Sequence, residues 1–393
     1  MTSFVHVLTA LLLLLVRGGI SSPVPSFTPS DVAQDPARRD AATAYSPYTL
    51  PRLVIYFQTT HDASGRPISL LPLITEKGIA LTHLIVCSFH VGAHGAALHL
   101  NDYPPSDARF QTLWREVQAL QAAGVRVMGM VGGAAAGSFA ADTLDSADSG
   151  TFEAAYGPLR DAIAAYGLQG MDLDVEQSMS QAGIARLVAR LARDFGDRFE
   201  VTLAPVASAL QPGGGGPNLS GFSYAALAST VAASPAGRIA FYNAQFYNGF
   251  GSLATPDDYE AVATNNGVFT PQNVLLGQIT SPAEGGDYVA PGTLKTTVAA
   301  LRAHYGAGSP LGGVMGWEYF DSEPGGSSAP WQWAQDMTAI LRPGQTPAIV
   351  MTQAEAEALV ATYKASTIMA PGNSGVQPAA QEPGVDYLAM VNA

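Results

Sequence analysis

The sequence predicts an α/β fold, a (β/α)8 barrel of the TIM type, formed as a single domain over residues 48–343. Eight short apolar runs recur along this stretch, helix-forming segments lie between them, and the fourth run carries three acids at alternating positions. Eight strands that alternate with helices are typical of this barrel, which usually takes ~250 residues plus insertions.

The apolar runs are short and rich in β-branched and aromatic residues, so each is expected to form a strand. In chain order they are 53–57, 83–89, 126–131, 168–176, 199–204, 238–246, 273–279 and 312–317. The segments between them have helical patterns at 107–123, 151–166, 181–195, 224–233, 294–305 and 331–341, with shorter helices expected at 70–76 and 256–263.

A doubly wound open sheet is the competing architecture. That fold usually has a glycine-rich nucleotide-binding turn after its first strand. Here the first run is followed by Thr59-Thr60-His61-Asp62, which has no glycine. The barrel is therefore favoured, and functional side chains are expected at the C-terminal ends of its strands.

Composition limits the possible partners. Of 393 residues, 47% are hydrophobic and only 13% are charged, so the chain can form a large core. The net charge of −13 argues against binding to nucleic acid or to anionic membranes, because both need basic surfaces. The lone Cys87 lies in an apolar run and is expected to be a small buried hydrophobe. A monomer is the expected state.

The two ends of the chain differ from the barrel segment. An apolar run at 7–16 predicts a signal peptide over residues 1–21, and hence a secreted, extracellular protein. Residues 22–39 end in Arg38-Arg39 and are interpreted either as a propeptide with a dibasic processing site or as a flexible linker. Residues 344–393 form a tail with one predicted helix at 353–364, which docks on the barrel or is removed.

The fourth run places Asp172, Asp174 and Glu176 on one face of a strand, because successive side chains point to opposite faces. A solvated edge strand could carry such acids, but helical segments flank this run, which favours burial. A metal site is the second alternative, although the spacing lacks the loop of a calcium hand, and no metal is expected. Buried neighbouring carboxyls favour a raised pKa and a group that can donate a proton.

Other predicted strands also end in amides, aromatics or glycines. Aromatic rings beside amides and acids at a barrel mouth suit a sugar, because rings stack on its apolar face and amides bond its hydroxyls. Ordinary core packing is expected instead for Phe246 and Tyr319. The residues at these strand ends are Tyr56, Gln58, Gly132, Gly133, Asn243, Gln245, Tyr247, Asn248, Trp317 and Glu318.

These motifs make the chain resemble glycoside hydrolase family 18 from about residue 50 to residue 342. The family signature Asp-x-x-Asp-x-Asp-x-Glu is matched at its last three acids, with Gln169 at the first position. The family's tyrosine after strand six falls on Tyr247, and its tryptophan on strand eight falls on Trp317. Its Ser-x-Gly-Gly on strand three is matched at both glycines, while Met130 replaces the serine.

The resemblance implies a substrate-assisted, retaining mechanism, in which the 2-acetamido oxygen of the sugar attacks the anomeric carbon. Glu176 would then be the acid and base, and Asp174 would bond the acetamido N–H. Asp172 would tune Asp174, while Tyr247 would hold the acetamido carbonyl and Trp317 would form the floor under the sugar. The resemblance implies no cofactor.

The family resemblance is compatible with two substrates, N-glycans and chitin. Gln245 and Asn248 stand where many chitinases of the family have Met and Asp, and the gap between 279 and 294 is too short for the extra α+β lobe of many chitinases. An open cleft follows, which suits the chitobiose core of N-glycans. The alternatives are an endochitinase and an inactive chitin-binding lectin. Three segments resemble the family's fungal secreted endo-β-N-acetylglucosaminidases, namely 245–249, 316–320 and 390–393.

Overall fold

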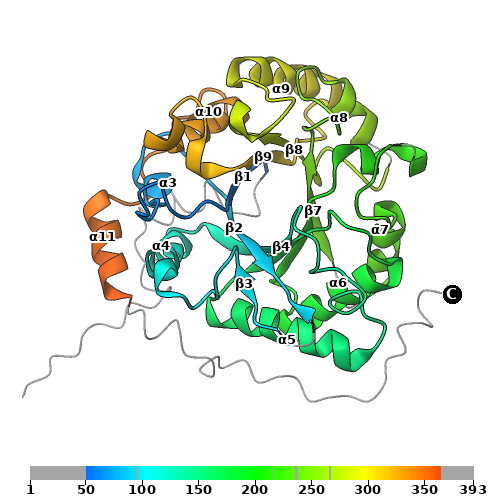
Figure 1. Cartoon of the computed structure of the whole chain (residues 1–393). Helices are drawn as coiled ribbons and strands as arrows, with labels where there is room; N and C mark the ends of the chain where they lie inside the picture. The colour runs from blue at the N-terminus through cyan, green and yellow to red at the C-terminus, as the bar shows by residue number, and fades with distance from the viewer. Residues whose placement is uncertain (1–49, 94–95, 215, 235–237, 265–266, 364–393) are drawn as a thin grey trace, which may run out of the picture. The chain divides into compact units, whose positions relative to one another are not determined.

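Eight parallel strands close into a barrel, and helices surround it (Figure 1). This computed structural model describes residues 50–93, 96–214, 216–234, 238–264 and 267–363. The first strand pairs with both the second and the last, which closes the barrel and confirms the predicted architecture. The barrel strands are β1 (Arg52–Phe57), β2 (His83–His90), β4 (Arg126–Gly132), β5 (Gly170–Asp174), β6 (Glu200–Leu203), β7 (Ile239–Gln245), β8 (Val274–Ile279) and β9 (Gly313–Trp317).

The helices lie within a few residues of the predicted ranges. They are α3 (Pro72–Thr75), α4 (Gln111–Ala122), α5 (Ser149–Ala165), α6 (Gln181–Phe195), α7 (Tyr224–Ala232), α8 (Asp257–Val262), α9 (Pro291–Tyr305), α10 (Trp331–Leu341) and α11 (Gln353–Thr362). The short strand β3 (His99–Leu100) was not predicted, and it pairs antiparallel to the end of β2.

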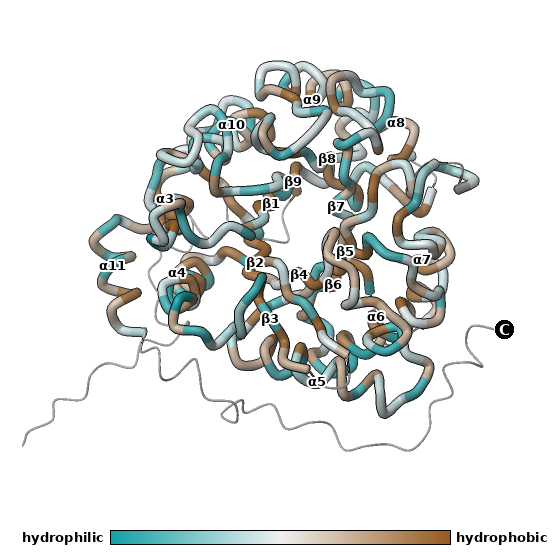
Figure 2. Tube along the Cα trace, in the orientation of Figure 1, coloured by the Kyte–Doolittle hydropathy of each residue, from teal (hydrophilic) through white to brown (hydrophobic). Residues whose placement is uncertain are grey.

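Alternation along the strands separates two cores. In β1, Leu53, Ile55 and Phe57 belong to the large core between the sheet and the helices, whereas Val54 and Tyr56 belong to a smaller core inside the barrel. Hydrophobic stretches follow the strands in Figure 2. The interior core also contains the free thiol Cys87, as predicted, and burial raises the pKa of this thiol well above its usual value.

Helix α6 illustrates why a segment between two strands becomes helical. Ser180 caps its N-terminus by accepting a hydrogen bond from the Gly183 N–H at 3.0 Å. Ile184, Leu187 and Leu191 recur at the helical period and are completely buried against the core. The helix therefore anchors the strand β5, which carries the acids.

The floor of the barrel is a buried polar cluster at the N-terminal ends of the strands. Glu200 Oε2 lies 3.0 Å from His83 Nε2, and Glu200 Oε1 lies 3.4 Å from Arg126 Nε. The guanidinium of Arg52 lies 4.6 Å from the centre of the Phe241 ring. Burial lowers the pKa of His83, although the neighbouring Glu200 opposes that shift. This cluster closes the end of the barrel opposite the acids.

Two connections bear on the domain organisation. Residues 280–290, between β8 and α9, contain one short 3₁₀ turn, η5 (Pro282–Glu284), and no additional lobe. Helix α11 packs against α4 and α3, as Figure 1 shows at the edge of the barrel. The predicted signal peptide, the propeptide and residues 364–393 lie outside the described residues. Among the helices described, none is long and apolar enough to cross a bilayer.

Candidate active site

Strand β5 carries two of the three predicted acids into the interior of the barrel. Asp172 is completely buried and Asp174 is 4% exposed. Leu173, between them, belongs to the core on the helix side, as the alternation requires. The strand ends at Asp174, two residues before the predicted end at Glu176, so Glu176 lies just past the strand, where it is half-buried. The acids therefore reach from the interior to the mouth.

Asp172 is held by three hydrogen-bond donors from three other strands. The Tyr56 hydroxyl donates to Oδ2 at 2.6 Å, and Oδ1 accepts from the Thr202 hydroxyl at 2.5 Å and from the Asn243 amide at 3.1 Å. Burial raises the pKa of Asp172, while these donors act in the opposite direction. The network fixes the orientation of the Asp172 carboxyl. Sequence reasoning did not identify Thr202.

The carboxamide of Gln245 bridges the other two acids. Its Nε2 lies 3.1 Å from Asp174 Oδ1, 3.2 Å from Glu176 Oε1 and 2.9 Å from the Ala204 carbonyl oxygen. Gln245 comes from β7 and lies in the register that the alternation of Asn243, Gln245 and Tyr247 predicts. One neutral side chain therefore holds two carboxyls together without adding a charge.

The electrostatics favour protons on this cluster. Burial raises the pKa of Asp174 well above its usual range, and the charges of Glu176 and Asp172 add to that effect. Burial also raises the pKa of Glu176, although the Gln245 hydrogen bond opposes the shift. A half-buried carboxyl that keeps its proton at mildly acidic pH can act as a general acid.

Two aromatic residues border the acids at the mouth. Tyr247 follows β7, is 7% exposed and belongs to the interior core. Burial raises the pKa of its hydroxyl well above the usual value, and the charges of Asp174 and Glu176 reinforce the shift. Trp317 ends β9, is half-buried and lies with its ring centre 5.5 Å from that of Tyr56. Phe246 and Tyr319 are buried in the main core, as predicted.

The glycine pair at the end of β4 has a backbone role. Both residues have positive φ angles, 108° for Gly132 and 86° for Gly133. A Cβ added to Gly132 would lie 2.2 Å from the Asp174 carbonyl oxygen. The Gly133 N–H donates to that same oxygen at 2.9 Å. The pair lets β4 approach β5 and fixes the backbone that carries Asp174.

Two other predicted binding residues use their side chains to position loops. Both carboxylate oxygens of Glu318 accept hydrogen bonds within the protein, Oε2 from the Gln58 and Thr59 N–H groups at 2.8 Å and Oε1 from the Thr59 hydroxyl at 2.7 Å. Asn248, at φ 56°, accepts a hydrogen bond from the Gly286 N–H at 2.8 Å. Glu318 thus shapes the loop after β1, and Asn248 ties the loop after β7 to the one after β8.

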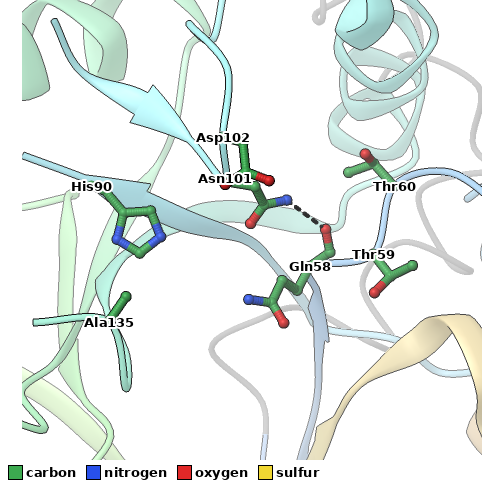
Figure 3. A pocket seen from close by; sticks show the side chains of 7 residues that line it. All are labelled: Gln58, Thr59, Thr60, His90, Asn101, Asp102 and Ala135. Carbon is green, nitrogen blue, oxygen red and sulfur yellow. Dashed lines mark hydrogen bonds between the residues drawn. The ribbon is translucent and has the colours of Figure 1, made fainter.

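A pocket of about 410 Å³ lies at the ends of β1, β2 and β4, and none of the three acids lines it (Figure 3). Gln58 stands two residues after Tyr56, and its carbonyl accepts a hydrogen bond from the Asn101 amide at 2.9 Å. Of the pocket residues, sequence reasoning singled out Gln58 alone. The positions of Thr59, Thr60 and His90 just after the first two predicted strands were the signal that could have identified these three. The lining residues are Gln58, Thr59, Thr60, His90, Asn101, Asp102 and Ala135.

A barrel whose fourth strand aims buried acids at its mouth, with amides and aromatics around them, is arranged for acid–base chemistry on a polar substrate. Among the described residues, no group of three or more His, Cys, Asp or Glu side chains could hold a metal ion. No protein-family model and no curated protein sequence matches the chain. Solved structures do match it.

The chain belongs to glycoside hydrolase family 18. It is 58% identical to a fungal endo-β-N-acetylglucosaminidase of that family, covering 76% of this chain and 100% of that one, with a TM-score of 0.71. It is also 42% identical to chitinase ChiC from Aspergillus fumigatus, covering 73% of this chain and 98% of that one, with a TM-score of 0.63. A chitinase A described as putative, from Streptomyces coelicolor, shares the fold at 19% identity and a TM-score of 0.55, covering 74% of this chain and 98% of that one.

Proposed function

We propose that this enzyme hydrolyses the β-1,4 bond between the two N-acetylglucosamine units in the chitobiose core of N-glycans, with retention of configuration. The observation that carries the proposal is the amide-bridged pair Asp174 and Glu176, with Gln245 Nε2 within 3.2 Å of both. The 58% identity to a fungal endo-β-N-acetylglucosaminidase supports the choice of substrate.

In the first step, the Glu176 carboxyl donates its proton to the glycosidic oxygen, and the bond from that oxygen to the anomeric carbon breaks. The acetamido carbonyl oxygen of the same sugar forms the new bond to the anomeric carbon, which gives an oxazolinium ring. Asp174 accepts a hydrogen bond from the acetamido N–H and stabilises the positive charge. The raised pKa of Glu176 supports its role as acid, because it favours the protonated carboxyl that this step requires.

In the second step, the Glu176 carboxylate takes a proton from a water molecule, and that water attacks the anomeric carbon from the face that the leaving group left. The oxazolinium ring opens, and two inversions restore the original configuration. Tyr247 donates its hydroxyl hydrogen to the acetamido carbonyl, and Trp317 lies beneath the sugar ring. Asp172, held by three donors, acts on Asp174 through its charge.

Endochitinase activity is the second candidate, because the chain is 42% identical to a fungal chitinase and the same residues would act on chitin. An inactive lectin is disfavoured by the presence of Glu176. The missing lobe between β8 and α9 leaves that side of the mouth open, which suits a branched glycan more than a single polymer chain.

A comparison of substrates tests the proposal. The enzyme is incubated with a high-mannose glycoprotein and with chitin oligomers, with Glu176→Gln as the inactive control, and the products are analysed by mass. We expect glycoprotein that retains one N-acetylglucosamine per site. Cleavage of chitin oligomers with an untouched glycoprotein would replace the proposal with the chitinase.

We propose further that the enzyme is secreted as a monomer, after removal of residues 1–21 and cleavage after Arg39. The apolar run, the dibasic pair and the net charge of −13 support this. N-terminal sequencing of enzyme from the culture medium should begin at Asp40. Enzyme that remains in the cells with Met1 intact would contradict the proposal, and light scattering measures the oligomeric state.

A further inference from the structure

The proposed proton donor lies in a loop, residues 175–180, that joins β5 to α6. Two residues of this loop, Val175 and Met179, are buried in the main core. Between them, Glu176 and Gln177 are only half-buried. The acid therefore lies in the part of the loop that the core does not hold directly.

The backbone around the acid has few hydrogen bonds of its own. Within the part of the chain that the structure describes, residues 175–178 make no backbone–backbone hydrogen bond. The next one along the chain runs from the Met179 N–H to the Ser220 carbonyl oxygen, at 2.8 Å. The Glu176 carboxyl contacts Gln245 Nε2 at 3.2 Å. A contact at the end of a side chain with several rotatable bonds does not by itself fix the backbone beneath it.

The side chain of Gln177 links this backbone to a neighbouring loop. Its Oε1 accepts a hydrogen bond from the Gly137 N–H at 2.6 Å and a longer one from the Phe139 N–H at 3.5 Å. Both donors belong to residues 133–148, the loop after β4. Because the acceptor meets two backbone donors, the contact holds the residue next to Glu176 in one place.

The loop after β4 is well fixed where it receives this contact. Phe139 is buried and belongs to the main core. The Thr143 hydroxyl donates to the Gly137 carbonyl oxygen at 2.7 Å and accepts from the Ala140 N–H at 2.9 Å. The donors that Gln177 meets are therefore held by the core and by the loop's own hydrogen bonds.

The same two loops are also joined on either side of Gln177. The Gly133 N–H donates to the Asp174 carbonyl oxygen at 2.9 Å, and the Ser180 N–H donates to Asp145 Oδ2 at 3.0 Å. Gln177 lies between these two contacts, in the middle of the segment that carries the acid. Its hydrogen bonds therefore complete the attachment of that segment to the loop after β4.

We propose that Gln177 is a positioning residue, whose side-chain oxygen holds the backbone at Glu176 in place by binding the Gly137 N–H. The inference rests on the proposed function, in which Glu176 gives its proton to the glycosidic oxygen and later takes one from water. Both transfers need the carboxyl within hydrogen-bond reach of the reacting oxygen. Gln177 acts on the reaction only through the backbone.

Hydrogen exchange tests the contact without any substrate. Gln177→Met keeps the length of the side chain and removes the acceptor. Exchange of the amides at 137–139, followed by mass spectrometry, should become about fivefold faster, as expected for the loss of one hydrogen bond. The matched control is Gln181→Met, because Gln181 Oε1 accepts from the Ser223 N–H at 2.9 Å and so faces α7 instead. Unchanged exchange at 137–139 in Gln177→Met would overturn the proposal.

Kinetics separate a misplaced acid from a loss of stability. In Gln177→Met we expect kcat on the high-mannose glycoprotein to fall about 10- to 100-fold at the acidic plateau, because a misplacement of about 1 Å can have that effect. KM should stay within about twofold of wild type. Gln177→Glu keeps an oxygen for the Gly137 N–H and should recover kcat to within about threefold of wild type. Gln181→Met loses a similar contact and should keep the wild-type kcat.

An activated substrate gives a readout that a purely structural role would not move. The nitrophenyl glycoside of the same glycan releases a phenolate that departs without a proton, so its kcat/KM depends little on the acid. Gln177→Met should lower kcat/KM by less than about threefold on this substrate, against about 10- to 100-fold on the glycoprotein. Equal losses on the two substrates, or a wild-type kcat in Gln177→Met, would overturn the positioning role.

The two hypotheses fail separately. If the wild-type enzyme cleaves neither the glycoprotein nor chitin oligomers, the proposed function is wrong, yet exchange at 137–139 still tests the contact. If the wild-type enzyme is active and Gln177→Met keeps both the protected amides and the rate, only the positioning role is wrong.

Discussion

Glu176, the proposed proton donor, lies in the loop that follows β5. The carboxyl lies two residues beyond β5, half-buried, with Oε1 at 3.2 Å from Gln245 Nε2. Glu176→Gln keeps the shape and removes the proton. Because a positioned acid contributes about 10²–10⁴-fold, we expect kcat to fall by about 10³-fold or more while KM changes little. Steady-state kinetics measure both constants, and near-normal turnover would remove Glu176 from the role of acid.

The Gln245 hydrogen bond lowers the pH at which Glu176 loses its proton. Burial raises the pKa of Glu176, and the Gln245 hydrogen bond lowers it. Activity should therefore fall as pH rises through this pKa, since the acid form is then lost. In Gln245→Leu the lowering contact is absent, so the falling limb of kcat/KM should move to higher pH while the rate itself decreases. Identical limbs in the two enzymes would contradict the assignment.

At the scale of elements, the contact between β4 and β5 depends on a glycine. Gly132→Ala would place a Cβ 2.2 Å from the Asp174 carbonyl oxygen at a φ of 108°. Backbone strain alone costs about 1–3 kcal/mol, and the clash adds to it. We expect a loss of at least about 2 kcal/mol in the free energy of unfolding, measured by urea denaturation, together with reduced activity.

Gly292, in the first turn of α9, is the control for that substitution. A Cβ there would meet nothing within 4 Å. Gly292→Ala should therefore leave activity unchanged and stabilise the fold by about 0.5–1 kcal/mol, because alanine loses less backbone entropy in a helix. If the two glycine variants behave alike, the argument from close approach fails.

At the scale of the molecule, α11 belongs to the folded unit. Ala356 is completely buried, Leu359 and Val360 pack against the main core, and the Met351 N–H donates to the Ile74 carbonyl oxygen at 3.2 Å. Truncation after Pro343 should lower Tm by roughly 5 °C. Truncation after Tyr363 keeps α11 and should leave Tm near that of the full chain. Equal Tm values for the two truncations would show that α11 adds no stability.

The two ends of the barrel affect the pH dependence of stability in opposite directions. Burial lowers the pKa of His83, so its contribution is lost as pH falls through 6.5 toward the folded-state value. Burial raises the pKa of Asp174, so folding becomes less favourable as pH rises from about 4 toward its folded-state value. Asp174→Asn removes the second effect, so calorimetry from pH 4 to 8 should show that Tm falls less, or rises more, with pH in this variant than in the wild type. Tm curves of the same shape in the two enzymes would contradict this.

Sequence patterns predicted much of this protein. The period of two along residues 168–176 placed Asp172 and Asp174 on one face, and the alternation of runs and helices predicted the barrel. Both inferences are local, because side-chain direction in a strand depends only on position. The short strand β3 was missed because two residues carry no period.

Only the tertiary structure decided which distant residues meet. Tyr56 reaches Asp172 across 116 positions, and Gln245 reaches Glu176 across 69. Glu318 was predicted to bind substrate at the barrel mouth, yet its carboxylate accepts a hydrogen bond from the Gln58 N–H in the loop after β1. Such contacts depend on closure of the barrel and on burial, which set the direction of each pKa shift. The sequence by itself therefore determined the acids and their strand, and closure of the barrel determined their partners.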